Sequence, residues 1–429
     1  MLTAASSYAR SAERRLEEAQ GLARAVDLEI AGAHLQNLAS PRAATLFGSG
    51  KVEELKALIA ETCATLVLVD AALSPVQQRN LERAWDVKVI DRTGLILEIF
   101  AARARTHEGR LQVELARLRY ERSRLVKTWT HLERQRGGLG KTGGPGETQI
   151  ESDRRLIRER IARLESKLDD VRKARTLQRS GRKKVPIQTV ALVGYTNAGK
   201  STLFNALTRA GVFAENLLFA TLDPTMRGLE LPSGRKIILS DTVGFISDLP
   251  TDLVAAFRAT LEEVQEADVI VHVRDASSPT HEAEQVDVVT VLGELGIAPD
   301  DGRILEVFSK IDLLSEDERT LLQARARAGT APLPISSTNG LGLDVLCAEL
   351  DQRLSVARVR ISAKLSASNG AAQAWLHANG EVLSCSMSED GTVHIEAWLD
   401  PEDLGRFESR YGSEVSVERA AHLIPRAAE

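Results

Sequence analysis

A glycine-rich segment between an apolar strand and a helix constrains the fold of this chain more than any other feature. The segment follows the apolar run 190–193, precedes the helical run 202–208, and has the spacing of a phosphate-binding loop. In such a loop, backbone N–H groups surround the phosphates at the positive end of the helix. The side chain of Lys200 would reach the β- and γ-phosphates, and the Ser201 hydroxyl would bind Mg²⁺. The residues predicted to bind nucleotide here are Gly194, Tyr195, Thr196, Asn197, Ala198, Gly199, Lys200, Ser201 and Thr202.

Two segments after this loop are predicted to face the γ-phosphate and the Mg²⁺ ion. Asp241 follows a strand at 236–240 and can hold the metal through water, while Gly244 can bring its N–H to the γ-phosphate. The segment 219–225 contains Thr221 and Thr225, either of which could complete the Mg²⁺ shell, and it would be released when the γ-phosphate is lost. We expect catalytic roles for Lys200, Gly244 and Thr221. The predicted nucleotide contacts in these two segments are Phe219, Ala220, Thr221, Leu222, Asp223, Asp241, Thr242, Val243 and Gly244.

A carboxylate after a later strand indicates which base is bound. Asp312 can accept hydrogen bonds from the N1–H and the exocyclic amine of guanine, whereas adenine has an acceptor at N1 and no such amine. Lys310 would lie along the base, and the backbone N–H groups of 336–338 would cover its other edge. The residues concerned are Ser309, Lys310, Ile311, Asp312, Ser336, Ser337 and Thr338. Five segments in this order predict a guanine nucleotide.

Two apolar seams predict a pair of long helices between the N-terminal and nucleotide-binding parts. Apolar residues recur at steps of three, four and seven in two stretches. The first runs from Leu111 to Leu132 and includes Trp129, and the second runs from Ile150 to Val171. The glycines and proline of 136–146 cannot continue a helix, so we expect an antiparallel hairpin with arms of about 40 Å. This loop is longer than a connector needs. The residues predicted to contact RNA at its tip are Arg136, Lys141, Gly143, Gly144 and Gly146.

Charge is distributed unevenly along the chain. Residues 103–184 contain 24 lysines and arginines and 11 aspartates and glutamates, a net charge of +13 within a chain of net −5. Such a segment attracts polyanions, although a solvated helical face would have the same composition. The three cysteines lie far apart, and no apolar run approaches the roughly 20 residues of a membrane span. We therefore expect a cytoplasmic protein.

Alternating strand and helix patterns predict the domain organisation. We expect an α/β architecture with an N-terminal parallel α/β domain at 1–105, the helical hairpin at 106–180, a doubly wound P-loop domain at 187–354, and a small α+β domain at 356–429. In the first domain, strands are expected at 66–70 and 87–91. In the P-loop domain, strands are expected at 189–194, 236–240, 269–275 and 304–309, after a basic linker at 179–186. In the last domain, strands are expected near 358–363, 382–387 and 393–399, with helices near 371 and 402. The glycines before Lys51 lack the spacing of a phosphate loop, which weakens the alternative of an RNA-remodelling protein that uses ATP in this domain.

These motifs together resemble the HflX family of ribosome-associated GTPases. The resemblance rests on Leu73–Glu82, Asp91–Ile96, Arg105–Gly109, Gly143–Gln149 and the five nucleotide segments. It implies GTP hydrolysis to GDP with Mg²⁺, the metal being bound by Ser201 and Thr221. It also implies docking on the rRNA of the large ribosomal subunit, with the glycine loop reaching the peptidyl-transferase region. GTP-bound members of the family split stalled or idle ribosomes into subunits, often under heat or other stress.

Three positions depart from common GTPase patterns. Ser309 replaces the Asn that usually begins the base-reading motif, and Met226 replaces a frequent Thr, to which we attach no function. Phe245 stands where Ras-like enzymes have Gln, and it cannot hydrogen-bond the attacking water. We therefore expect slow intrinsic turnover that a partner must stimulate. We expect a monomer. A GTP-dependent signalling switch, whose basic hairpin docks an acidic partner, is an open alternative.

Overall fold

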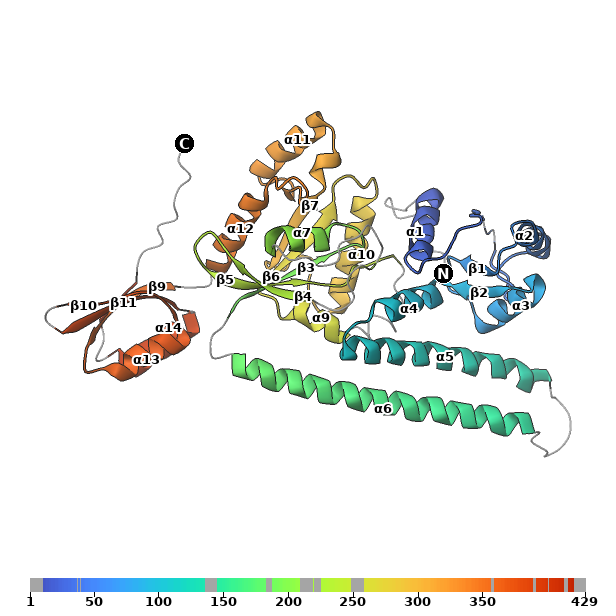
Figure 1. The fold of residues 1–429 in the computed structure, drawn as a ribbon, viewed down its shortest axis with the longest axis horizontal. Helices are drawn as coiled ribbons and strands as arrows, with labels where there is room; N and C mark the ends of the chain where they lie inside the picture. The colour runs from blue at the N-terminus through green and yellow to red at the C-terminus, as the bar shows by residue number, and fades with distance from the viewer. Residues whose placement is uncertain are drawn as a thin grey trace.

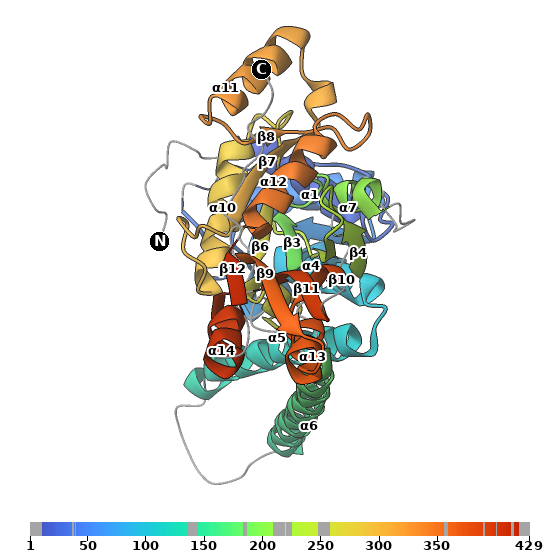
Figure 2. The ribbon, with the colours of Figure 1, turned by 90° about the vertical axis from the view of Figure 1, so that its left-hand side faces the viewer.

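The computed structural model describes residues 11–36, 38, 40–135, 145–182, 187–208, 219, 225–247, 258–355, 359–388, 391–399, 401–412 and 416–419. It is a mixed α/β structure, as predicted. A central domain with a large sheet lies between an N-terminal domain and a C-terminal domain, and two long helices run beneath (Figures 1 and 2).

The central domain is a doubly wound sheet. Its strand order is β4-β5-β3-β6-β7-β8, and all pairs are parallel except β4 with β5. Strands β3 and β6 are almost entirely buried, because helices cover both faces of a parallel sheet. The elements are β3 (Thr189–Gly194), α7 (Lys200–Thr208), β4 (Thr225–Glu230), β5 (Lys236–Asp241), α9 (Arg258–Gln265), β6 (Val269–Asp275), α10 (His281–Glu294), β7 (Ile304–Ser309), the 3-10 turn η1 (Ile311–Leu313), α11 (Glu316–Arg327), β8 (Leu333–Pro334) and α12 (Leu343–Ser355).

The predicted strands of this domain are confirmed, but the edge strand β4 was not anticipated. Its residues mix exposed and half-buried positions without strict alternation, and it pairs antiparallel with β5 across a turn at Gly234. Gly234 has φ of +85°, a conformation that favours glycine. The short-range pattern of β4 was too weak to predict a strand.

The N-terminal domain contains a two-stranded parallel sheet surrounded by helices. Strands β1 and β2 pair in register from Leu66 with Lys88 to Val69 with Asp91, which confirms the predicted parallel arrangement. A Ser74 capping box and Pro75 at the first helical position begin α3. The elements are α1 (Ala12–Arg24), α2 (Ser49–Glu61), β1 (Leu66–Val69), α3 (Pro75–Trp85), β2 (Lys88–Asp91) and α4 (Arg92–Arg103).

Helix α4 joins the N-terminal domain to the central domain through one continuous core. Ile96, Ile99 and Phe100 are at most 1% exposed, and they belong to the same buried cluster as β3 and β6 of the central sheet. Leu22 of α1 and Val113 of α5 belong to it as well. A helix that is apolar on most of its surface must be enclosed. The two domains therefore share a hydrophobic core around α4.

The two predicted long helices are α5 (His107–Gln135) and α6 (Pro145–Arg182), and they lie side by side in Figure 1. Their apolar seam is buried as expected and comprises Leu111, Leu115, Ile161, Leu164 and Leu168, with Leu118 and Ile157 at its margin. Ion pairs from Arg119 to Glu165 and from Arg160 to Glu114 flank the seam. The long periodic pattern was thus sufficient to predict the pairing.

The boundaries of α6 differ from the expected ones. Pro145 and Gly146, predicted to lie in the tip loop, form the first turn of α6. Proline is compatible with that position because its missing N–H has no helical acceptor there. At the other end α6 continues through Gly181 to Arg182, although a linker was expected from Arg179.

The C-terminal domain is an antiparallel sheet with two helices and its own core. The strand order is β10-β11-β9-β12, and alternate residues of β11 face Phe407 and its neighbours. The predicted strands and helices are present, whereas the four-residue strand β12 was missed. The elements are β9 (Val359–Ser366), α13 (Gly370–Asn379), β10 (Glu381–Met387), β11 (Thr392–Leu399), α14 (Pro401–Tyr411) and β12 (Ser416–Arg419).

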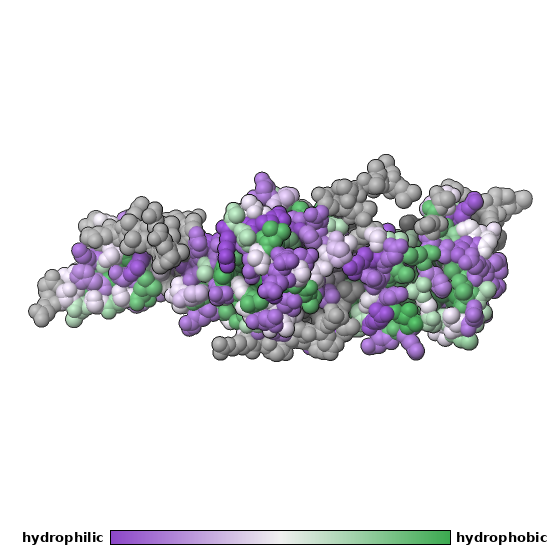
Figure 3. All heavy atoms as spheres, turned by 90° about the horizontal axis from the view of Figure 1, so that it is seen from above, coloured by the Kyte–Doolittle hydropathy of each residue, from purple (hydrophilic) through white to green (hydrophobic). Residues whose placement is uncertain are grey.

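The visible surface is mixed in character. Figure 3 shows hydrophilic residues interspersed with smaller hydrophobic areas over all three domains. In the described ranges, no helix is both long enough and apolar enough to cross a bilayer.

The hairpin seam gives the first prediction. Leu164→Ala removes a side chain that is 5% exposed, so we expect a loss of about 2–5 kcal/mol of local stability. Hydrogen exchange should accelerate throughout α5 and α6 while the protection of β3 and β6 is kept. Leu156→Ala, at a position 54% exposed on the same helix, is the matched control and should change little. Equal effects of the two substitutions would contradict the assigned seam.

Candidate nucleotide-binding site

The loop between β3 and α7 has the backbone geometry of a phosphate cradle. Asn197 and Gly199 have φ of +61° and +92°, which turns successive N–H groups toward one concave side. A Cβ on Gly194 would stand 2.2 Å from the carbonyl oxygen of Val273 on β6. Only glycine therefore allows β3 and β6 to approach closely where the loop begins.

Lys200 is buried at the start of α7, inside this loop. Its Nζ donates hydrogen bonds to the carbonyl oxygens of Gly194 (3.1 Å) and Tyr195 (2.8 Å). The pKa of Lys200 is lowered to about 8, mainly by burial. The nearby Lys310 contributes to this decrease, whereas Asp241 opposes it. A phosphate beside this ammonium would restore the charged form. The site is therefore electrostatically suited to a polyanion.

Ser201 and Asp241 lie together at the ends of α7 and β5. The Ser201 hydroxyl donates to Asp241 Oδ2 at 2.7 Å, and Asp241 is fully buried. The hydroxyl Oγ1 of Thr196 is also buried, with no hydrogen-bond partner among the described residues. These carboxylate and hydroxyl oxygens lie beside a phosphate loop and are suitable ligands for Mg²⁺, which prefers oxygen ligands and keeps part of its water shell. These residues therefore fit the predicted metal.

The segment after β5 pairs with the phosphate loop through its backbone. Thr196 N–H donates to Phe245 O at 2.7 Å, and Phe245 N–H donates to Gly194 O at 3.2 Å. A Cβ on Gly244 would stand 3.0 Å from the Lys200 Nζ, so glycine is needed for this approach. Thr242 faces inward and donates from its hydroxyl to Leu192 O at 2.6 Å. Gly244 is thus held against the loop, as its predicted role requires.

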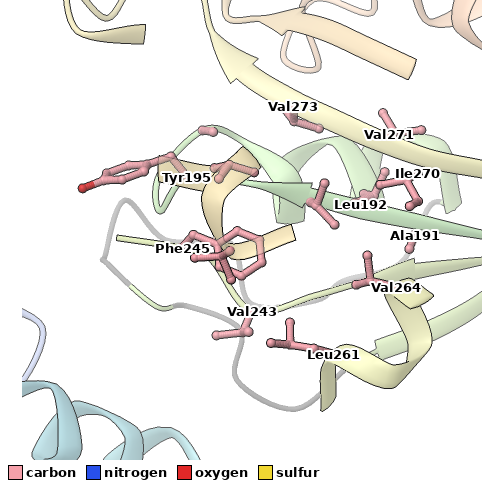
Figure 4. Packing of buried hydrophobic residues seen from close by; sticks show 14 of the residues in the cluster. Ala191, Leu192, Tyr195, Val243, Phe245, Leu261, Val264, Ile270, Val271 and Val273 are labelled. Atoms are coloured by element: carbon pink, nitrogen blue, oxygen red, sulfur yellow. The ribbon is translucent and has the colours of Figure 1, made fainter. Parts of the chain in front are cut away.

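Phe245 belongs to the core of the central domain. It is 1% exposed, and Figure 4 shows it inside the cluster between β3 and α9, while Tyr195 projects away from that cluster. An apolar ring in this position offers no hydrogen bond to a water. The structure therefore agrees with the prediction that this side chain does not orient the nucleophile.

Ser309 links three segments at the predicted base site. Its hydroxyl contacts the carbonyl oxygens of Ala198 (2.6 Å) in the phosphate loop and Arg274 (3.0 Å) on β6. It is 1% exposed. A serine can therefore join neighbouring loops at this position, where the larger amide of asparagine is usual.

The two predicted base-binding segments contact each other. Ser336 Oγ donates to Asp312 Oδ1 at 2.6 Å, which orients the carboxylate. Lys310, in the left-handed conformation with φ of +57°, pairs with Asp275 at 2.8 Å. The Ser336 N–H donates to Leu341 O at 2.9 Å within the loop, and the contact of 336–338 with a base edge stays a prediction.

The structure brings most of the predicted site residues together. Residues 194–202, 241–244, 309–312 and 336–338 meet at the carboxyl edge of the sheet, where ligands bind in doubly wound folds. Phe219 is 2% exposed and contacts Phe100 of α4, with ring centroids 4.8 Å apart. Several predicted residues lie outside the described residues, namely Ala220, Thr221, Leu222, Asp223, Arg136, Lys141, Gly143 and Gly144.

Sequence reasoning missed two acidic residues that contact the site. Asp275 holds Lys310, and its position at the end of a predicted strand was the same signal that identified Asp241. Glu18 of α1 accepts a hydrogen bond from the Tyr195 hydroxyl at 2.8 Å. No local pattern marks Glu18, because it lies 177 residues from Tyr195 in the sequence.

Protein-family models match four consecutive parts of the chain. Their descriptions are GTP-binding GTPase N-terminal (residues 13–101), GTP-binding GTPase Middle Region (103–182), 50S ribosome-binding GTPase (189–305) and HflX C-terminal domain (321–421).

Named relatives match over nearly the whole length. The GTPase HflX of Magnetococcus marinus is 52% identical over 406 residues, covering 94% of this chain and 93% of the relative. The GTPase HflX of Escherichia coli (strain K12) is 44% identical over 391 residues, covering 91% of each. Among solved structures, a GTP-binding protein from Sulfolobus solfataricus in complex with GDP is 25% identical, with a TM-score of 0.43, and the match covers 80% of this chain and 97% of that one.

The lowered pKa of Lys200 makes nucleotide affinity depend on pH. Phosphate binding favours the charged ammonium, so affinity for a non-hydrolysable GTP analogue should fall as pH rises above about 8, and binding there should take up protons. Isothermal titration calorimetry in buffers of different ionisation enthalpy measures both effects.

Two substitutions control this measurement. Lys200→Met should bind weakly and lose the pH dependence, whereas Lys51→Met should behave like the unmodified protein, since Lys51 only pairs with Glu54 on the exposed side of α2. Constant affinity from below pH 8 to well above it would contradict the assignment of Lys200.

Proposed function

The chain belongs to the HflX family of GTPases, and from this premise we propose that it binds the large ribosomal subunit and, in its GTP state, splits stalled or idle ribosomes into subunits. The observation that carries the proposal is a guanine-nucleotide site and a basic helical hairpin within one structure. The ribosome would stimulate hydrolysis and thereby end each cycle. Ribosome binding and a stress-related role in the cytoplasm belong to this proposal.

The residues of the site would act mainly by positioning and charge stabilisation. Lys200 and the N–H groups of the loop and of Gly244 would stabilise negative charge on the transferring phosphoryl group. Ser201 and Thr221 would hold Mg²⁺, with Asp241 acting through water, and the ion would neutralise charge on the β- and γ-phosphate oxygens. Because Phe245 is apolar and buried, the attacking water lacks a partner at that position. Slow basal turnover with stimulation by a partner follows from this arrangement.

The hairpin supports rRNA as that partner. The segment 103–184, which contains the hairpin, has a net charge of +13. It includes Arg155 and Arg163, whose side chains are 71% and 74% exposed beside weak surface ion pairs. Exposed arginines of this kind can exchange such pairs for phosphates with release of counterions. The loop between α5 and α6 would extend this basic surface to the tip.

Neither alternative is favoured by a comparable observation. An ATP site in the N-terminal domain would need a loop around Gly48 and Lys51, but Gly48 is the N-cap of α2 and Lys51 pairs with Glu54. A signalling switch that docks an acidic protein on the hairpin would not respond to ribosomal subunits. Stimulation of GTP hydrolysis by purified ribosomal subunits therefore distinguishes a ribosome-splitting GTPase from a signalling switch.

Base selectivity should depend on Asp312. Asp312→Asn replaces an acceptor with a donor, so we expect GTP affinity to fall by about tenfold or more, because guanine donors lose their partner. Xanthosine triphosphate, which has an acceptor in place of the exocyclic amine, should gain affinity. Fluorescent-nucleotide competition measures both. Asp317→Asn on the exposed first turn of α11 is the control. An unchanged preference for guanine in Asp312→Asn would exclude this role.

Ribosome splitting should require the tip of the hairpin. GTP hydrolysis should rise by at least about tenfold with large subunits, and light scattering should show GTP-dependent dissociation of whole ribosomes. The double substitution Arg136→Ser with Lys141→Ser should abolish dissociation while leaving basal hydrolysis intact. Arg325→Ser with Arg327→Ser on α11 removes the same charge elsewhere and should have no effect. Full dissociation activity without the tip charges would refute the proposal.

A further inference from the structure

A cluster of four polar residues connects the phosphate loop to the N-terminal domain. The Tyr195 hydroxyl accepts a hydrogen bond from Ser247 N–H (2.8 Å) and donates one to Glu18 Oε2 (2.8 Å). Ser247 lies three residues after Gly244, whose N–H is predicted to contact the γ-phosphate. We call Glu18, Arg92, Tyr195 and Ser247 the α1–α4 clamp, because α1 and α4 supply its two charged members.

Arg92, the first residue of α4, closes the clamp. Its guanidinium donates to the Ser247 carbonyl oxygen and Oγ, both at 3.0 Å, and forms ion pairs with Glu18 and with Asp70 (2.6 Å). Burial by itself lowers the pKa of Arg92, but these two carboxylates outweigh it and raise the pKa. The side chain is 6% exposed. A buried charge with this many partners is geometrically specific, and removing one partner is costly.

Near its other end, α4 contacts Phe219, the first residue of the segment 219–225 that is predicted to be released when the γ-phosphate is lost. Phe100 packs edge-on against Phe219 at 4.8 Å. Phe219 has φ of +57°, which is unusual for an aromatic residue and is maintained only by its surroundings. Arg92 and Phe100 are about 12 Å apart along the helix. One buried helix therefore contacts both Phe219, at the start of the segment 219–225, and Ser247, three residues after Gly244.

Asp91, directly before Arg92, binds the middle of α5, the first helix of the hairpin. It is 2% exposed and accepts hydrogen bonds from Tyr120 Oη (2.5 Å) and from Arg124 (2.5 Å), both on α5. It also caps α4 by accepting from Gly94 N–H at 2.8 Å. At the start of α4, Asp91 thus binds α5 of the hairpin, and the adjacent Arg92 binds Ser247 in the segment after Gly244.

We propose that α4 transmits the state of the bound nucleotide to the helical hairpin, with Glu18, Arg92 and Tyr195 as positioning residues for Ser247 and with Asp91 as the link to α5. A change at Ser247 displaces Arg92, and the shared backbone of residues 91 and 92 passes the change to Tyr120 and Arg124. Such coupling requires that both sites bias the same element, which α4 satisfies through the contacts described above. The inference concerns coupling within the chain and does not depend on the identity of the partner.

Hydrogen exchange of the full-length protein tests the coupling without ribosomes. Amides of α5 at 115–124 should exchange at rates that differ by about fivefold or more between the GDP complex and the complex with a non-hydrolysable GTP analogue. Glu18→Gln keeps the volume and one acceptor of the side chain but removes its charge. It should abolish this difference at α5 while both nucleotides still bind. Glu17→Gln, on the neighbouring residue that pairs with Arg14 on the exposed side of the same helix, should leave the difference unchanged.

A second substitution tests the link to the hairpin. Tyr120→Phe removes the hydroxyl that donates to Asp91 and keeps the ring beneath Arg124. It should reduce the nucleotide-dependent difference in α5 and leave that of α1 and α4 intact, which a purely structural role would not do. No difference in α5 in the unmodified protein, or a full difference in both Glu18→Gln and Tyr120→Phe, would overturn the inference. Ribosome splitting could still hold in either case.

Discussion

Helix α4 is buried in a hydrophobic core that the N-terminal domain shares with the central sheet. Its leucines, isoleucines and phenylalanine belong to the same core as the central sheet, so the N-terminal domain cannot separate from the nucleotide site without exposing that core. Each large apolar side chain that is fully buried contributes about 1.5–3 kcal/mol. An interface of this kind resembles the interior of one domain more than a contact between two. The C-terminal domain, with its separate core, differs in this respect.

Lys200 and Arg92 are both buried cations, but their surroundings differ. Lys200 is a buried cation with carbonyl partners and a lowered pKa, so its environment favours the arrival of an anion. Arg92 is a buried cation already neutralised by Glu18 and Asp70, so it holds its neighbours in place. The first arrangement suits binding and the second suits positioning. They lie on opposite sides of Tyr195, whose carbonyl accepts from Lys200 and whose hydroxyl donates to Glu18.

Much of the fold could be predicted because its signals are local or periodic. The strands at 189–194, 269–275 and 304–309 were predicted to the residue, since each is a buried apolar run followed by a polar motif. The hairpin was predicted from its repeating seam. The start of α6 at Pro145 was not, because glycine and proline are common in loops and equally compatible with a first helical turn. Strands β4 and β12 lie at sheet edges, and the residues of β4 do not alternate strictly between buried and exposed positions.

Reading the sequence alone was enough to predict the nucleotide site, because the loop, Asp241 and Asp312 each follow a strand at a recognisable spacing. The sequence also determined the uneven charge and the family to which the chain belongs. Three features were visible only in the folded chain. Ser309 joins the phosphate loop to β6, Ser336 orients Asp312, and α4 contacts α5, Phe219 and Ser247. The physical reason is that these contacts join residues 24 to 155 positions apart, and no periodicity or spacing encodes which distant side chains a folded core brings together.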